Sequence, residues 1–107
     1  MNKIVKIALG ATLLLSLGTA TLSADVAKGQ KLFTKKLKGA CGITGAQMAG
    51  KHTQDEWQEI KDGGTLGAEI KTICPSVKDK ALKEKYMNHY FDFFKEYGSD
   101  SGNVPSC

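Results

Sequence analysis

A chain of 107 residues, of which 24% are charged, has room for one small domain beside a targeting segment. The net charge is only +4 and every basic residue is a lysine, which excludes a nucleic-acid-binding signature and disfavours bidentate arginine–phosphate sites. The sequence has no nucleophile beside a base, no carboxylate pair and no phosphate-binding loop, so we do not expect an enzyme.

Residues 1–24 have the features of a secretory signal peptide. Two lysines precede an apolar run from Ile7 to Leu17, and small residues follow it. We expect cleavage after Ala24, with Ala20 as the alternative site. The apolar run is too short and too interrupted by glycine to span a bilayer, so no stable membrane anchor is expected after cleavage. Residues 25–107 would then form a periplasmic or otherwise exported domain.

The exported part is predicted to be an all-α domain of about four helices, because its apolar residues recur at helical spacing. Glycine lowers helix stability, so Gly29 in the first helix indicates a close crossing by another helix, with Phe33 beside it. The aromatic C-terminal helix is the expected partner. The predicted helices run from Asp25 to Gly39, from a cap at Thr53 to Gly63, from a cap at Thr65 to Cys74, and from Asp79 to Tyr97.

Two segments are predicted to lie outside helices. Residues 42–51 contain three glycines and are expected to form a loop or a short irregular turn. The polar tail, residues 99–107, is expected to be ordered only if its last residue, Cys107, is tied down.

Three cysteines, Cys41, Cys74 and Cys107, remain after the signal peptide. An oxidising compartment favours one disulfide and one leftover thiol, and three pairings are open. The leftover thiol would be free, capped, or bound to a ligand. No C-x-x-C pair is present, so a structural disulfide is expected rather than a catalytic one.

The order of these features resembles a small periplasmic class I cytochrome c. The resemblance is carried by the AKGQKLF helix, the cysteine–glycine loop, the segment MAGKHTQDEW and the final helix in KDKALKEKYMNHYFDFF. It covers nearly all of residues 25–107. It implies a cytochrome c-like fold, haem, and electron transfer with a periplasmic redox or respiratory protein as partner.

The haem-attachment motif departs from the pattern of that family. A c-type cytochrome needs C-x-x-C-H, that is, two thiols and an adjacent imidazole. After Cys41, this chain has Thr44 for the second cysteine and Gly45 for the histidine. The methionine that binds the iron from the other side would fall near Cys74. Ordinary covalent haem attachment is therefore not expected.

A non-standard haem site would draw on Cys41, Met48 and His52, with His52 as the metal ligand. The competing interpretation makes His52 a solvent-facing residue at the start of a helix and Met48 a core residue. A copper or zinc site formed by Cys41, Met48, His52 and Cys74 has suitable ligand types but no dense local motif.

The family resemblance and the altered haem-attachment motif together lead to two candidate functions. The first is a haem-free or non-standard derivative that acts as an exported binding or accessory module stabilised by a disulfide. The alternative is a haem-binding electron-transfer protein of a respiratory chain. In the family, Cys41 and Cys74 would lie on opposite sides of the haem crevice. For a protein without haem, the resemblance implies that these two cysteines form the disulfide, while the pairings with Cys107 stay open. Lysines 31, 35, 36 and 38 would offer an acidic partner a docking face.

Overall fold

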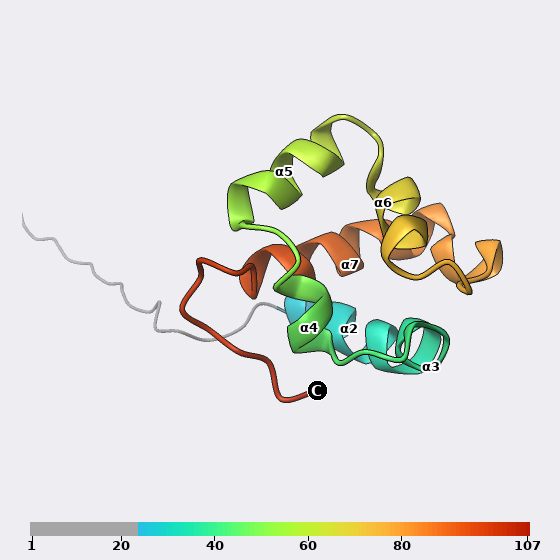
Figure 1. The fold of residues 1–107 in the computed structure, drawn as a ribbon, viewed down its shortest axis with the longest axis horizontal. Helices are drawn as coiled ribbons and strands as arrows, with labels where there is room; N and C mark the ends of the chain where they lie inside the picture. The colour runs from blue at the N-terminus through green and yellow to red at the C-terminus, as the bar shows by residue number, and fades with distance from the viewer. Residues whose placement is uncertain (1–23) are drawn as a thin grey trace, which may run out of the picture.

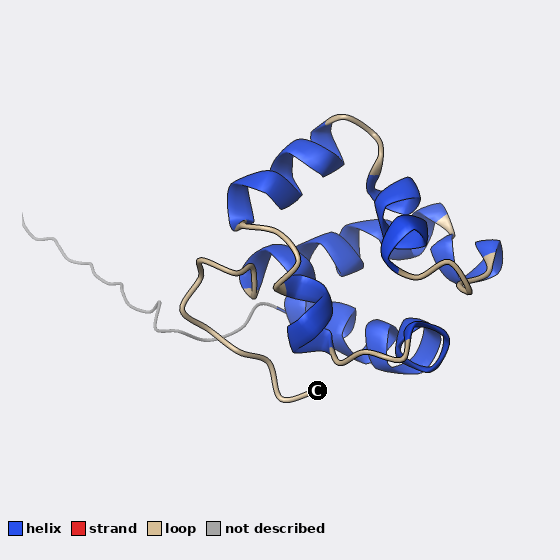
Figure 2. Ribbon diagram, viewed as in Figure 1, coloured by secondary structure: helices blue, strands red, loops and turns tan. Residues whose placement is uncertain are grey.

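The first and last helices of the described chain cross each other, and the other helices pack on this pair (Figure 1). The computed structural model describes residues 24–107, so the predicted signal peptide lies outside it except for Ala24. No strand forms among residues 24–107, which confirms the all-α prediction (Figure 2). Five helices form there instead of about four, because a short helix replaces part of the predicted loop.

The described helices have the following bounds in chain order. One continuous helix is made of α2 (Ala24–Leu32), the π-helical turn η2 (Phe33–Leu37) and α3 (Lys38–Cys41). It is followed by α4 (Gly45–Ala49), α5 (Gln54–Asp62), α6 (Leu66–Ile73), the 3-10 turn η3 (Asp79–Leu82) and α7 (Glu84–Glu96). None of the helices within residues 24–107 has the length and apolar character needed to cross a membrane.

The first helix is longer than predicted. Gly39 does not end it, because the helix continues through Cys41 and stops at Gly42, which has the left-handed φ of 68°. Within this helix, the backbone N–H of Lys38 donates to the carbonyl of Phe33, five residues earlier. That bond defines the π-helical turn, for which the sequence carries no recognisable pattern.

The predicted crossing at Gly29 is confirmed. A Cβ atom at this position would lie 2.0 Å from the carbonyl oxygen of His89 and 2.8 Å from the Cβ of Phe93. Beside this contact, the ring centroid of Phe33 lies 5.8 Å from that of Phe93 and 6.4 Å from that of Phe94. The absence of a side chain at Gly29 therefore allows α7 to approach closely enough for these rings to pack.

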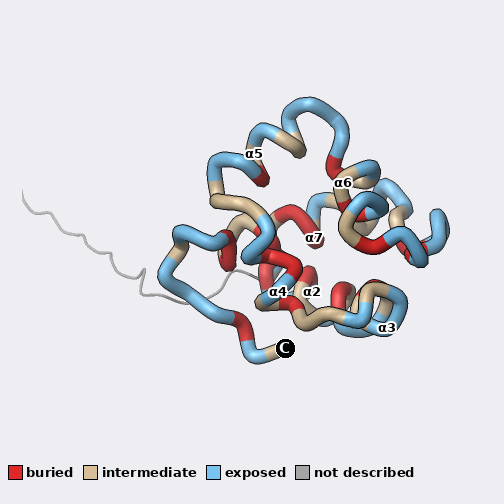
Figure 3. Tube along the Cα trace, viewed as in Figure 1, coloured by how far each residue is buried: buried red, intermediate tan, exposed pale blue. Residues whose placement is uncertain are grey.

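The core lies between α7 and the other helices, where buried segments face one another in Figure 3. Its largest fully buried side chains are aromatic. Trp57 on α5 is fully buried, and its ring lies 4.8 Å from that of Phe94. Its indole N–H donates to the carbonyl of Ala49 over 2.8 Å. Tyr90 is also fully buried, and its hydroxyl donates to the carbonyl of Ala81 over 2.7 Å. The polar atoms of both large rings are thus satisfied.

The helix starts confirm one predicted cap and correct two predictions. Thr53 and Glu56 form the expected reciprocal capping box. The backbone bond from Thr53 is the main reason why the pKa of Glu56 is lowered. Thr65 makes no cap, because its hydroxyl donates to the Ile60 carbonyl instead. The predicted loop contains α4 because Thr44 forms a second capping box with Gln47.

The final predicted helix is divided in two. The residues of η3 form a 3-10 turn, and Lys83 is extended, with φ −63° and ψ 147°, before α7 begins. The carbonyl of Ala81 accepts the hydroxyl of Tyr90, so it is held by a side chain of the next helix. The predicted helix is interrupted at Lys83, next to this tertiary hydrogen bond, and the spacing of the apolar residues does not predict the interruption.

The C-terminal tail packs without a disulfide, which corrects the expectation that Cys107 must be bonded for order. The backbone N–H of Ser99 donates to the His52 carbonyl, and that of Ala46 donates to the Cys107 carbonyl. The amide of Gln30 donates to the hydroxyl of Ser106 over 3.0 Å. Cys107 itself is a free, half-buried thiol. Hydrogen bonds to three separate parts of the chain thus hold the tail.

Substituting Gly29 by alanine should destabilise the domain by at least about 2 kcal/mol, because the new methyl group would overlap the backbone of α7. The measurement is urea unfolding of the purified protein. The matched control is Gly39→Ala, where a Cβ meets nothing within 4 Å and alanine should stabilise the helix by about 0.5–1 kcal/mol. Equal effects of the two substitutions would contradict the tight crossing.

The titration of Tyr90 should make the free energy of unfolding fall as the pH rises in the alkaline range. Burial is the main reason why the pKa of Tyr90 is raised to about 12, against an ordinary value of about 10. The folded state therefore keeps this proton where the unfolded state loses it. The contribution of Tyr90 to the free energy of unfolding is complete below about pH 10 and declines as the pH rises towards 12.

Urea unfolding of the wild type and of Tyr90→Phe at several pH values between 9 and 11.5 tests this coupling. The stability difference between the two proteins should shrink as the pH rises. Tyr86→Phe is the control because Tyr86 is only half-buried and its pKa is lowered. A constant difference between the wild type and Tyr90→Phe across this range would show that Tyr90 does not titrate in this way.

Candidate functional site

The disulfide joins Cys41, at the end of α3, to Cys74, which follows α6. Their Cα atoms are 4.8 Å apart. Of the three pairings open from the sequence, the structure has the one that the family resemblance implies for a protein without haem. Cys107 is the leftover thiol. The bond ties the first helix to α6 across 33 positions of sequence.

His52 is held between two carboxylates. Its Nε2 lies 2.7 Å from Oε2 of Glu69, and its Nδ1 lies 3.5 Å from Oε1 of Glu56. The imidazole and the Trp57 ring form a T-shaped pair, with ring centroids 4.8 Å apart and planes at 86°. His52 is therefore partly buried, and each of its ring nitrogens faces a carboxylate oxygen. Glu69 was not predicted because it is 17 residues away and no local pattern connects it to His52.

Met48 is fully buried on α4 and belongs to the hydrophobic core. Its thioether therefore does not face an open site, and the core interpretation is the correct one. Within residues 24–107, no group of three or more histidine, cysteine or acidic side chains is arranged to hold a metal ion. The four-residue copper or zinc set that the sequence analysis considered is not assembled here, because the sulfurs of Cys41 and Cys74 are bonded to each other.

The same geometry tests the fit of haem. The sulfur of Cys41 is in the disulfide, Nε2 of His52 contacts Glu69, and Met48 is enclosed by apolar side chains. A thioether bond and an axial ligand both need free atoms at these positions. The residues in this arrangement do not fit a bound haem.

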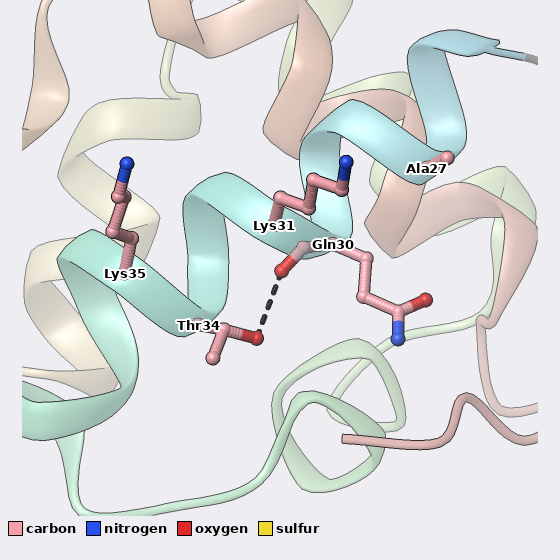
Figure 4. Close-up of a pocket in the computed structure, with 5 residues that line it drawn as sticks. All are labelled: Ala27, Gln30, Lys31, Thr34 and Lys35. Carbon is pink, nitrogen blue, oxygen red and sulfur yellow. Dashed lines mark hydrogen bonds between the residues drawn. The ribbon is translucent and has the colours of Figure 1, made fainter.

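The lysine face of the first helix includes a groove of about 500 Å³, lined by Ala27, Gln30, Lys31, Thr34 and Lys35 (Figure 4). Lys31 and Lys35 are exposed and extend to the same side of the helix in this view. The Thr34 hydroxyl donates to the Gln30 carbonyl, so it is engaged within the helix. Lys31 and Lys35 are the two cations of the groove that a partner can reach.

The predicted docking face needs one correction. Lys36 does not extend with Lys31 and Lys35, because its ammonium group lies 4.8 Å from the ring centroid of Tyr86 on α7. A cation over an aromatic face is attracted by the electrons of the ring. Lys36 therefore does not line the groove. It lies at the junction of η2 and α7, which Lys35 also borders.

Replacing both bonded cysteines, as in Cys41→Ser/Cys74→Ser, should lower the free energy of unfolding by about 3–4 kcal/mol, because the closed loop of the unfolded chain is released. The measurement is urea unfolding without reductant. Cys107→Ser is the control, since Cys107 has no disulfide partner. Equal stability of the double variant and the wild type would contradict a structural role for the bond.

No protein-family model, no curated protein and no solved structure matches this chain. A function for it must therefore be argued from its own residues and their geometry.

Proposed function

We propose that this protein is an exported, haem-free derivative of a cytochrome c-like fold, and that it acts as a binding or accessory module stabilised by a disulfide. The Cys41–Cys74 bond is the single observation that carries this proposal. The resemblance assigns Cys41 to the haem-attachment loop and Cys74 to the neighbourhood of the distal ligand. In a haem protein, these two positions would lie on opposite sides of the porphyrin.

A direct bond between these positions leaves no gap for a porphyrin plane. The Cα atoms of Cys41 and Cys74 are 4.8 Å apart, which is an ordinary separation for a disulfide. A haem could enter only if this bond broke and the two walls separated. The crosslink therefore supplies the connection between the walls that a cofactor would otherwise supply.

The packing of the core supports a fold that is stable without a cofactor. Trp57, Phe33 and Phe94 are fully buried, and the ring of Phe94 contacts the rings of both others. Full burial of such side chains contributes about 1.5–3 kcal/mol each through the hydrophobic effect. A small domain commonly needs one further restraint, and the disulfide provides it.

The charge distribution favours an acidic protein as the partner of this module. Lys31 and Lys35 are exposed on the first helix, whereas the exposed side of α5 carries Asp55, Glu59 and Asp62. Opposite charges on two faces orient a molecule as it approaches a charged surface. We propose a periplasmic redox or respiratory protein as this partner, which would meet the first helix with its acidic surface.

The absorption spectrum of the protein exported from cells that attach haem is the decisive measurement. We expect no Soret band, an intact mass two hydrogens below that of the fully reduced chain, and one titratable thiol. A c-type cytochrome exported from the same cells is the positive control. These results together would separate a haem-free module from a protein that merely failed to mature.

A Soret band in the purified protein would overturn the proposal and favour the electron-transfer alternative. A band that survives acid–acetone extraction would mean covalent attachment, and a band that is lost would mean non-covalent binding. In either case, the spectrum of His52→Ala would show whether His52 binds the iron.

A further inference from the structure

A second pocket lies where η2 meets η3 and the start of α7. Its volume is about 390 Å³, within the range of small-molecule sites. Four of its six lining residues are lysines and none is acidic. We call it the four-lysine pocket, and its lining residues are Lys35, Lys36, Lys80, Ala81, Lys83 and Tyr86.

The ammonium groups of this pocket have no carboxylate partners within the described chain. The salt bridges among residues 24–107 involve His52, Lys71 and His89, and none of the four pocket lysines. Two acidic residues close in sequence are turned to other sites. Asp79 pairs with Lys71, and Glu84 lines a separate pocket beside Met87.

The positive charges converge on one side chain. Lys36 and Lys85 lie with their ammonium groups 4.8 Å and 5.4 Å from the ring centroid of Tyr86. Desolvation raises the pKa of Tyr86, but a hydrogen bond from Lys36 and the charges of Lys36, Lys85 and Lys83 outweigh it, so the pKa is lowered. A negative charge at the Tyr86 hydroxyl is thus favoured by its surroundings.

The lysine ammonium groups of the pocket repel one another when no negative charge lies among them. Like charges that line one pocket disfavour each other, and an anion with several charges reduces that repulsion for several lysines at once. A lysine ammonium is a compact charge with three donors and no rigid fork. The pocket would therefore select total charge and oxygen acceptors rather than one planar group.

We propose that the four-lysine pocket binds a multivalent oxyanion, meaning a molecule or chain end that carries at least two phosphate or carboxylate groups. Lys35 and Lys36 from η2 would hold one side of it, and Lys80 and Lys83 the other. Tyr86 also lines the pocket, and its hydroxyl would be a further donor to the anion while it is protonated. This proposal does not depend on whether the protein binds haem.

Calorimetric titration at low ionic strength tests this site with two probes, inorganic tripolyphosphate and citrate. The variant is Lys80→Gln/Lys83→Gln, since both side chains are exposed. It also leaves Lys31 and Lys35 of the docking face intact. The matched control is Lys28→Gln/Lys51→Gln, which removes the same charge from exposed lysines that do not line the pocket.

Binding of at least one probe should weaken about tenfold or more in Lys80→Gln/Lys83→Gln and less than about twofold in the control. Binding of tripolyphosphate alone would identify a phosphate ligand, and binding of citrate alone a carboxylate ligand. Either result supports the site. Equal weakening in both double variants would overturn it as non-specific charge attraction, and so would the failure of both probes to bind the wild type.

Discussion

The close approach of two backbones at Gly29 is the constraint on which the rest of the structure depends. With the His89 carbonyl so near, any side chain at position 29 would push α7 away. That displacement would separate Phe33 from Phe93, and the aromatic core would lose its centre. It would also move Tyr90, whose hydroxyl holds η3. One missing side chain thus sets the helix spacing from which both the core and the lysine-rich junction follow.

The disulfide and the four-lysine pocket occupy two separate parts of the first helix and give it two roles. Its C-terminal end at Cys41 is covalently tied to Cys74, so that end is fixed whatever binds elsewhere. The π-helical turn before it presents Lys35 and Lys36 to the start of α7. A rigid support beneath flexible lysine side chains is a suitable arrangement for holding an anion with little cost in backbone ordering.

The sequence predicts what depends on neighbouring residues and leaves open what depends on distant ones. The crossing at Gly29 and the cap at Thr53 were predictable because their patterns are local. The Thr44–Gln47 capping box has the same local pattern and could have been predicted, but the surrounding glycines favoured a loop. The contact of His52 with Glu69 required tertiary packing. The lysine density of residues 78–85 was visible, whereas its meeting with η2 was not.

The disulfide also changes how the chain is connected. Residues 41–74 form a covalently closed ring that contains α4, α5 and α6, while the first helix and α7 are two arms that leave the ring and cross. The turn at Gly63 and Gly64 lies within the ring and is exposed. A single protease cut in that turn would open the ring without separating the two arms. In a compartment that contains proteases, such a chain keeps its two crossing helices in one molecule after a first cleavage.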